Sequence, residues 1–347
     1  MNNRISFRSL SKYRTQFMGL AIIFVMLCHN TVKVPEGVQT IRHVVSAIFQ
    51  SGVDVFMLLS GLGLYYSFRK KPEIRSFLKK RLVKILIPYI IVVIGYAFIH
   101  VWYMGRTTLA AYLWDASLIS FFIDGAMRIW FVAAIILLYF LYPLLHKILQ
   151  RTTKGFVCMI LGIVAGCLII SYCPVRRSFT IVNELFVSRI PAFLTGMLIA
   201  KGLWSEQSRS VKSGVVWIGW GLSLAMIMWI ILLAPENWWA IVRLLFLPFT
   251  LSGMLLLGQM MDRRGKEERS LRKLCSFLGG ITFELYLLHE KVLETLNEFL
   301  YLFHVSPILL SVIANIMAIL IAVLGAWILN KVVEFLTKHT FSMCKSC

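Results

Sequence analysis

The chain is poor in charged residues and especially poor in acidic ones. Of its 347 residues, 15% are charged, and 16 Asp and Glu stand against 36 Lys and Arg, which gives a net charge of +20. An average soluble domain is about 25% charged and roughly 45–50% apolar, whereas this chain is 59% hydrophobic with a mean hydropathy of +0.78. This composition excludes an ordinary soluble protein, and the 24 Phe and 10 Trp exclude a disordered one.

The motifs of common soluble enzymes are also missing. The sequence has no Walker phosphate loop, no GxSxG nucleophile turn, no HExxH zinc helix and no pair of CxxC motifs. We therefore expect no metal ion, and we look for chemistry among polar residues at membrane depth.

Ten segments are long and apolar enough to cross a bilayer, for which about 20 mostly apolar residues are needed. They are 15–33, 44–67, 82–104, 128–149, 156–173, 186–203, 213–233, 238–260, 277–303 and 306–333. The segment 107–124 is aromatic but is interrupted by Asp115 and Asp124, so we interpret it as a lid or a re-entrant stretch. No linker divides the chain, which predicts a single membrane domain over residues 1–347.

The basic residues predict the orientation of these spans. With the N-terminus in the cytoplasm, the cytoplasmic segments contain 27 of the 36 Lys and Arg, and the outward loops contain 7. These cytoplasmic segments are 1–14, 68–85, 146–155, 201–212, 261–273 and 331–347. Because Lys and Arg accumulate in cytoplasmic loops, we predict an all-α polytopic membrane protein with both termini in the cytoplasm. The basic residues are dispersed over short segments, so we expect no nucleic-acid partner.

His29 is the first candidate for catalysis, because ionisable groups at membrane depth are costly to bury. It ends the apolar run 19–29 and follows Arg14 by fifteen residues, about 22 Å along a helix and toward the outer leaflet. A neutral imidazole can take a proton from a hydroxyl, as a general base must. The alternative is a histidine near the outer interface that makes one hydrogen bond.

Asp54 is the second candidate, at the start of the otherwise apolar segment 52–64. It could orient a histidine or bind the mouth of a site, but an aspartate near a helix N-terminus is favourable without any further role. Ser60, Gly61 and Gly63 follow it and permit the close approach of another helix. Elsewhere, the small residues Gly162 and Gly166 predict helix packing in the same way.

A second histidine, a tyrosine and a carboxylate fall inside the expected span 277–303, which is more than packing needs. Tyr286 and His289 are three residues apart and share one helix face, whereas Glu284 lies to one side. Arg81 and Lys84 likewise share a face where a basic run enters the membrane, and such a pair could hold a phosphate at the cytoplasmic mouth. The alternative for this pair is anchoring to anionic lipid.

These landmarks, taken in order, resemble a known family. The motifs are GVDVFMLLSGLGL at 52–64, FLKKRLVKILIPY at 77–89, IWFVAAIILLYFLYPLL at 129–145, RIPAFLTGMLI at 189–199 and LGGITFELYLLH at 278–289, after His29 at the end of the first span. The chain thus resembles the acyltransferase-3 family of integral-membrane O-acyltransferases over nearly its whole length.

The resemblance implies an activity. It implies transfer of an acyl group, often acetyl, from cytoplasmic acyl-CoA to a hydroxyl of a carbohydrate or lipid-linked glycan, in a multi-pass protein of the plasma membrane. It further implies that His29 is the base. From their own positions in the sequence, Asp54, Glu284, Tyr286 and His289 are the further candidates for the catalytic site. Membrane lipid and the glycan-synthesis machinery are the expected partners.

The basic positions of the family are matched only in part. Arg81 and Lys84 match the pair associated with the acyl donor, although arginine is more usual at the second position, so bidentate phosphate binding is lost there. The family often has an arginine eleven residues before the histidine, where this chain has Met18. Arg14, one turn earlier on a similar face, is the candidate to replace it at the donor site.

Two other functions are compatible with a membrane bundle of this kind. One is a transporter or flippase that moves a small polar solute or a glycan on the same fold, and the other is a non-catalytic partner of a polysaccharide synthase. Only an acyltransferase requires an acyl-CoA.

Overall fold

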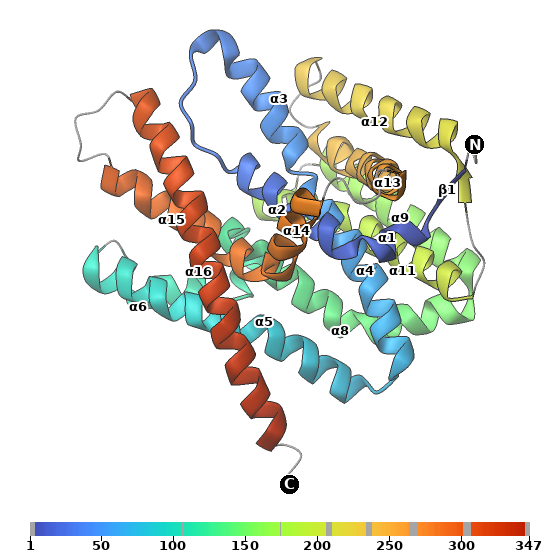
Figure 1. Cartoon of the computed structure of the whole chain (residues 1–347), viewed down its shortest axis with the longest axis horizontal. Coiled ribbons are helices and arrows are strands. Elements are labelled where there is room, and N and C mark those ends of the chain that lie inside the picture. The colour runs from blue at the N-terminus through green and yellow to red at the C-terminus, as the bar shows by residue number, and fades with distance from the viewer. Residues whose placement is uncertain are drawn as a thin grey trace.

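The structure, a computed structural model, is almost entirely helical. It describes residues 4–105, 107–173, 175–205, 210–233, 238–263, 269–300 and 307–343. The only sheet within these ranges is a two-stranded antiparallel ribbon of β1 (Arg4–Ser6) and β2 (Ser210–Lys212). The prediction of an all-α polytopic membrane protein is therefore confirmed (Figure 1).

The helices up to the middle of the chain include both long spans and short connecting pieces. They are α1 (Arg8–Lys12), α2 (Arg14–Cys28), a 3₁₀ turn (Glu36–Val38), α3 (Gln39–Phe49), α4 (Gly52–Lys70), α5 (Ile74–Ala97) with a π-helical extension (Phe98–Tyr103), α6 (Leu109–Asp115), α7 (Ser120–Asp124), a 3₁₀ turn (Met127–Ile129), α8 (Trp130–Arg151) and α9 (Thr153–Tyr172).

The helices of the second half of the chain also include both long spans and short connecting pieces. They are α10 (Arg177–Leu185), a 3₁₀ turn (Val187–Arg189), α11 (Ile190–Trp204), α12 (Ser213–Leu233), α13 (Trp239–Arg263), α14 (Arg269–Gly280), α15 (Thr282–Leu300) and α16 (Pro307–Met343).

Eight helical segments of the described chain are long and apolar enough to cross a membrane, by length and composition. They are Glu36–Lys70, Ile74–Tyr103, Trp130–Arg151, Thr153–Tyr172, Arg177–Trp204, Ser213–Leu233, Trp239–Arg263 and Ile308–Lys338. Each overlaps one of the ten expected spans. The segment 107–124 forms α6 and α7, which are both too short to cross.

The two remaining expected spans differ from single long helices. The first, 15–33, contains α2, whose 15 residues fall short of the usual 20. The other, 277–303, is divided at Ile281 into α14 and α15, and α15 contains charged residues along its length. Residues 301–303 of this span, and residue 306 of the next, lie outside the described residues. The number ten therefore stays a prediction.

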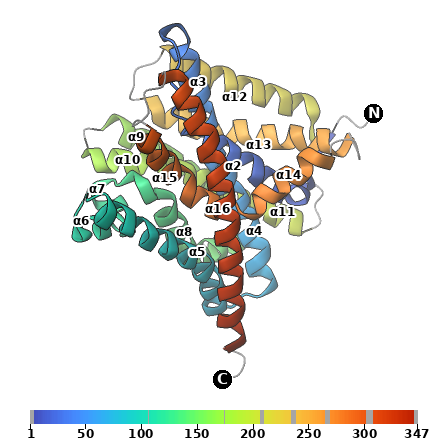
Figure 2. The same ribbon diagram turned by 60° about the vertical axis from the view of Figure 1, so that its left-hand side comes forward.

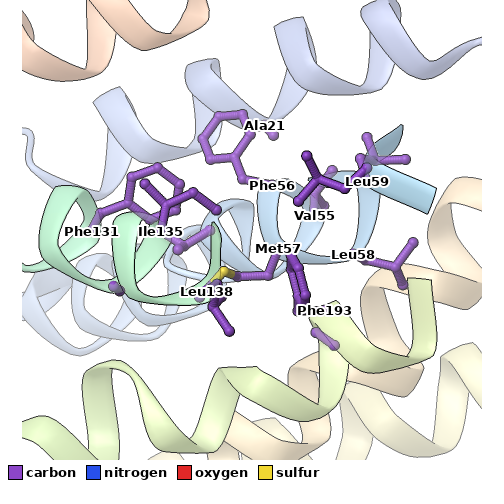
Figure 3. Packing of buried hydrophobic residues seen from close by; sticks show 14 of the residues in the cluster. Ala21, Val55, Phe56, Met57, Leu58, Leu59, Phe131, Ile135, Leu138 and Phe193 are labelled. Atoms are coloured by element: carbon purple, nitrogen blue, oxygen red, sulfur yellow. The ribbon is translucent and has the colours of Figure 1, made fainter. Parts of the chain in front are cut away.

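Helix α4 is the centre of the bundle. Its residues Val55–Leu59 are buried on every side against α2, α8 and α11, with Phe131 and Phe193 among the facing side chains (Figure 3). A helix that is apolar all round belongs in such a core. Gly61 allows helix α11 to approach closely, because any side chain at this position would overlap the Phe193 carbonyl. The sequence predicted this role for Gly61.

Helices α9 and α12 lie at the outside. Large apolar side chains are exposed along both, including Leu161 on α9 and Trp217 on α12, as expected for contact with lipid tails. The interpretation of Gly162 and Gly166 as a packing motif is wrong, because open space lies next to both glycines. The spacing of small residues alone does not bring a neighbour.

Contacts between connecting segments agree with the expected sidedness. β1 pairs with β2, and Lys12 forms an ion pair with Asp262, so the expected cytoplasmic segments 1–14, 201–212 and 261–273 meet at one end of the bundle. In Figure 1 the β-ribbon and the α4–α5 turn lie at the right, whereas the α2–α3 connection and α6 lie at the left.

Candidate functional site

His29 and His289 lie side by side although they are 260 positions apart in the sequence. His29 directly follows α2, and His289 belongs to α15. Their ring centres are 5.0 Å apart, edge to face, and His289 Nε2 is 3.4 Å from His29 Nδ1. Close packing of α14 on α2 sets this pairing, because a side chain at Gly19 or Gly279 would overlap the backbone of the facing helix.

Backbone carbonyl groups determine the tautomers of the two histidines. His29 Nδ1 is 2.8 Å from the Val25 carbonyl oxygen, and His289 Nδ1 is 2.8 Å from the Tyr286 carbonyl oxygen. A carbonyl oxygen only accepts, so the hydrogen-bond network assigns the proton to each Nδ1. His289 Nε2, which faces the Nδ1–H of His29, therefore holds a lone pair, and His29 in its neutral form has its lone pair on Nε2. His29 is exposed, and its Nε2 has no hydrogen-bond partner among the described residues. That atom is available to take a proton.

Tyr286 lies in the same cluster, as its spacing from His289 predicts. The two ring centres are 5.8 Å apart, and the Tyr286 ring also packs against Phe131 at 5.0 Å. The charge of Glu290 acts on both His29 and Tyr286. We call His29, His289 and Tyr286 the histidine cluster.

Asp54 pairs with an arginine. Arg189 Nε is 3.3 Å from Asp54 Oδ2, and the two side chains are 2% and 1% exposed. Arg189 also donates to the carbonyl oxygens of Glu184 and Leu185, at 3.1 and 2.7 Å, and its guanidinium lies 5.1 Å from the ring centre of Trp130. Within the described residues, no hydrogen bond connects Asp54 to a histidine.

Arg243 lies close to this buried ion pair. It is 7% exposed, and its charge acts on Asp54 and Glu184. Its Nε and Nη1 atoms are buried and have no hydrogen-bond partner within the described residues. Asp54 and Glu184 are therefore the candidate carboxylate partners of Arg243.

Glu284 lies on α15 like His289, but its hydrogen-bond partner belongs to α16. It accepts a hydrogen bond from Asn330 Nδ2 of α16 at 3.1 Å. The charge of Lys84 on α5 acts on Glu284 and on Glu334. In the described part of the chain Glu284 is therefore bound to α16 and makes no hydrogen bond to a histidine.

Arg14 and Arg81 come together at the opposite end of α2 from His29. Arg14 Nε donates to the Leu59 carbonyl oxygen at 3.2 Å, and its guanidinium occupies the space that a side chain at Gly63 would fill. The charges of Arg14 and Arg81 act on each other unfavourably, and both act on Tyr139. No carboxylate pairs with either arginine among the described residues. We call Arg14 and Arg81 the arginine cluster.

Unpaired polar atoms surround the arginine cluster. Arg81 Nε and the Tyr142 hydroxyl are both buried without a hydrogen-bond partner within the described ranges, and the charge of Arg81 acts on Tyr142. Lys84 is exposed and its charge acts instead on carboxylates. The structure therefore joins Arg14 to Arg81 and places Lys84 beside them, where carboxylates balance part of its charge.

Sequence reasoning missed several polar residues of the two clusters and their surroundings. Arg189 opens the motif RIPAFLTGMLI, but only its burial reveals its role. Asn315 donates to Thr31 Oγ1 at 3.1 Å, and Asn297 donates to the same atom at 2.9 Å, so α15 and α16 both hold the loop after His29. Uncharged amides inside apolar segments were the available signal for Asn315 and Asn330.

The chain matches one protein-family model, that of the acyltransferase-3 family, which is described as an acyltransferase domain. The match extends over residues 19–331, most of the chain. It includes the histidine cluster, Asp54, Arg81 and Lys84, and begins after Arg14. No curated protein and no solved structure matches the chain.

Proposed function

Because the chain belongs to the acyltransferase-3 family, we propose that this membrane acyltransferase moves an acetyl group from cytoplasmic acetyl-CoA to a hydroxyl of a cell-surface or lipid-linked carbohydrate. The observation that carries the proposal is the histidine cluster. It presents the accessible Nε2 atom of His29 at the end of α2 expected to face outward, while unpaired cations lie at the other end.

His29 acts as the general base in this proposal. Its Nε2 takes the proton of the acceptor hydroxyl, and the alkoxide oxygen attacks the thioester carbonyl carbon. The new C–O bond forms as the C–S bond breaks, and the proton passes to the leaving thiolate of coenzyme A. The C-terminal end of α2 favours the positive charge that His29 carries between these two transfers.

A negative charge develops on the thioester oxygen during this step. Tyr286 supports the proposal as a donor to that oxygen, because it lies beside His289. Arg243 is a second candidate, since two of its buried nitrogen atoms have no partner in the described chain. Neither role requires Asp54 or Glu284 to orient the base.

The arginine cluster is the proposed site for the phosphate groups of the donor. Two guanidinium groups without a carboxylate partner form a favourable environment for phosphate, which guanidinium binds in a bidentate manner. From there an extended pantetheine arm leads the thioester along α2, over about 22 Å, toward His29. Lys84 adds positive charge at the entrance.

The setting of the reaction follows from the same proposal. Acceptors of this class are made by the glycan-synthesis machinery, which we propose as a partner in the plasma membrane. Lipid contacts the exposed apolar faces of α9 and α12.

The decisive experiment follows labelled acetyl groups. Membranes that contain the full chain are incubated with radiolabelled acetyl-CoA and with total cell glycan, and the label in glycan is measured. We expect transfer by the wild type, and a loss of about 10²–10⁴-fold in His29→Ala. His43→Ala is the matched control, because His43 is exposed on α3 and packs edge to face against Trp239 with ring centres 6.0 Å apart.

Two results contradict the proposal. Retention of full transfer in His29→Ala rules out this histidine as the base. Gradient-driven movement of a sugar that needs no acetyl-CoA, with no label in glycan, would instead indicate a transporter.

A further inference from the structure

A pocket with several charged side chains opens beside Tyr286 of the histidine cluster. It lies between α5, α8, α15 and the segment that contains α6, and its lining includes Tyr286 and Glu290 of α15 with Asp115 and Arg128. Figure 2 shows α6 and α7 at the edge of the bundle beside α5 and α8. The aromatic segment 107–124 that we expected to form a lid or a re-entrant stretch therefore supplies a wall of this pocket.

The wall made by this segment is held firmly in place. The Tyr112 hydroxyl donates to the Val93 carbonyl oxygen at 2.9 Å, and the Tyr89 hydroxyl donates to the Ala116 carbonyl oxygen. Both tyrosines line the pocket, but their hydroxyl groups are already used. They consequently offer apolar ring surface to a ligand rather than hydrogen bonds.

Two residues connect the pocket to the proposed base. Tyr286 lines the pocket and its ring centre is 5.8 Å from that of His289. Glu290, the next residue after His289, also lines the pocket, and its charge acts on His29. A ligand in the pocket thus lies next to the histidine cluster.

The charges of the pocket select the class of ligand. Arg128 pairs with Glu294 at 3.8 Å, and Lys291 Nζ lies 4.9 Å from the ring centre of Tyr96, so both cations already have partners. By contrast, no hydrogen bond or ion pair occupies the carboxylates of Asp115 and Glu290 within the described residues. Free carboxylates accept hydrogen bonds from hydroxyl groups and repel anions.

We propose that this pocket binds the acceptor as a neutral sugar, with Asp115 and Glu290 accepting from its hydroxyl groups and the tyrosine rings covering its C–H face. The inference rests on the proposed function, which makes the ligand an acceptor. It adds the location of the site and the neutral character of the sugar.

Asp115 provides the test, because it lines the pocket from α6 and does not belong to the histidine cluster. With purified full-length protein, neutral methyl glycosides as acceptors and labelled acetyl-CoA as donor, Asp115→Ala should raise the acceptor KM about tenfold or more. The KM for acetyl-CoA should not change. Asp115→Asn, which retains one acceptor oxygen, should give a smaller increase.

Asp124→Ala is the matched control. Asp124 belongs to the same segment and accepts from Trp114 Nε1 at 2.7 Å, but it does not line the pocket. An equal rise in acceptor KM in Asp124→Ala would mean that loosening of the segment causes the effect, and it would overturn the role of Asp115.

A binding measurement separates this inference from the proposed function. Without acetyl-CoA, the neutral glycosides should raise the Tm of the wild type, and Asp115→Ala should lose most of that shift. Glucose 1-phosphate, as the anionic probe, should give a smaller shift than methyl glucoside. A larger shift with the anion, or no shift with any glycoside, overturns the neutral-sugar assignment.

Failure of the proposed function and failure of the pocket assignment would give different results. Absence of label transfer from acetyl-CoA, together with an Asp115-dependent Tm shift, contradicts the proposed function and leaves a sugar site. Transfer by the wild type with an unchanged acceptor KM and an unchanged shift in Asp115→Ala contradicts the pocket alone.

Discussion

The two ends of α2 differ in how their charges are balanced. At the Arg14 end, two arginines repel each other and no carboxylate pairs with them among the described residues. At the His29 end, the buried charge of Arg189 is paired with Asp54, and the charges of Asp54 and Glu184 act favourably on the neighbouring Arg243. An ion pair needs no further partner, whereas an unpaired cation can bind an anionic ligand. We therefore expect the paired charges to support the fold, and we propose that the unpaired arginines support binding.

Breaking the Asp54–Arg189 pair is expected to have the largest effect. Asp54→Asn leaves Arg189 buried at 2% exposure without its counter-charge. Removing one partner of a buried pair costs about 3–5 kcal/mol, so the free energy of unfolding should fall by this amount. The measurement is unfolding of the detergent-solubilised protein, followed by its helical signal.

An exposed ion pair provides the control for this prediction. Lys71 and Glu73 are 3.3 Å apart, and their side chains are 71% and 56% exposed. Glu73→Gln should therefore change the stability by at most about 1 kcal/mol. If Asp54→Asn were as mild as Glu73→Gln, the ion pair would not be a structural element and the contrast between the two ends of α2 would disappear.

Arg81→Gln should give the opposite pattern. It removes a cation that has no partner in the described chain, and it relieves the repulsion of Arg14. We expect no loss of stability, but a KM for acetyl-CoA raised about tenfold or more, because a charge-assisted hydrogen bond to phosphate is lost. Initial rates of acetyl transfer at varied acetyl-CoA measure this, and the acceptor KM should stay unchanged.

Arg75→Gln is the matched control for Arg81→Gln. Arg75 belongs to the same basic run at the start of α5, but it is exposed. It should leave both KM values unchanged. A similar rise in both variants would show that the run acts by its overall charge, as expected for attraction to anionic lipid, and not through a site at Arg81.

The fold was predictable where the evidence for it lies in the order of residues along the chain. Apolar length gave most of the spans, and the distribution of Lys and Arg grouped segments that the structure does bring together, such as 1–14 with 201–212. The helix break at Ile281 was not predicted, because an apolar run such as Leu278–Leu288 looks continuous despite the glycines inside it. Gly162 and Gly166 show the reverse error, since a motif says nothing about whether a partner helix is present.

The site was predictable in its components but not in its pairings. His29, His289 and Arg81 were each recognisable as costly polar groups at membrane depth. That His29 contacts His289, that Asp54 pairs with Arg189 and that Glu284 binds Asn330 all depend on which helices become neighbours. Tertiary packing decides which helices become neighbours, and these pairings cannot be inferred from a single sequence.

The smallest predicted effect tests whether Arg14 contributes to donor binding in addition to Arg81. A methyl group at Gly63 would come within 2.9 Å of the Arg14 guanidinium, which is the flexible end of a side chain and can move aside. Gly63→Ala should consequently keep the stability within about 1 kcal/mol, since alanine also favours the helix, and should raise the KM for acetyl-CoA only a few-fold. Gly95→Ala is the control, because nothing lies near that glycine. If Gly63→Ala left the KM as unchanged as Gly95→Ala does, Arg14 would not contribute to donor binding, and the arginine cluster would reduce to Arg81.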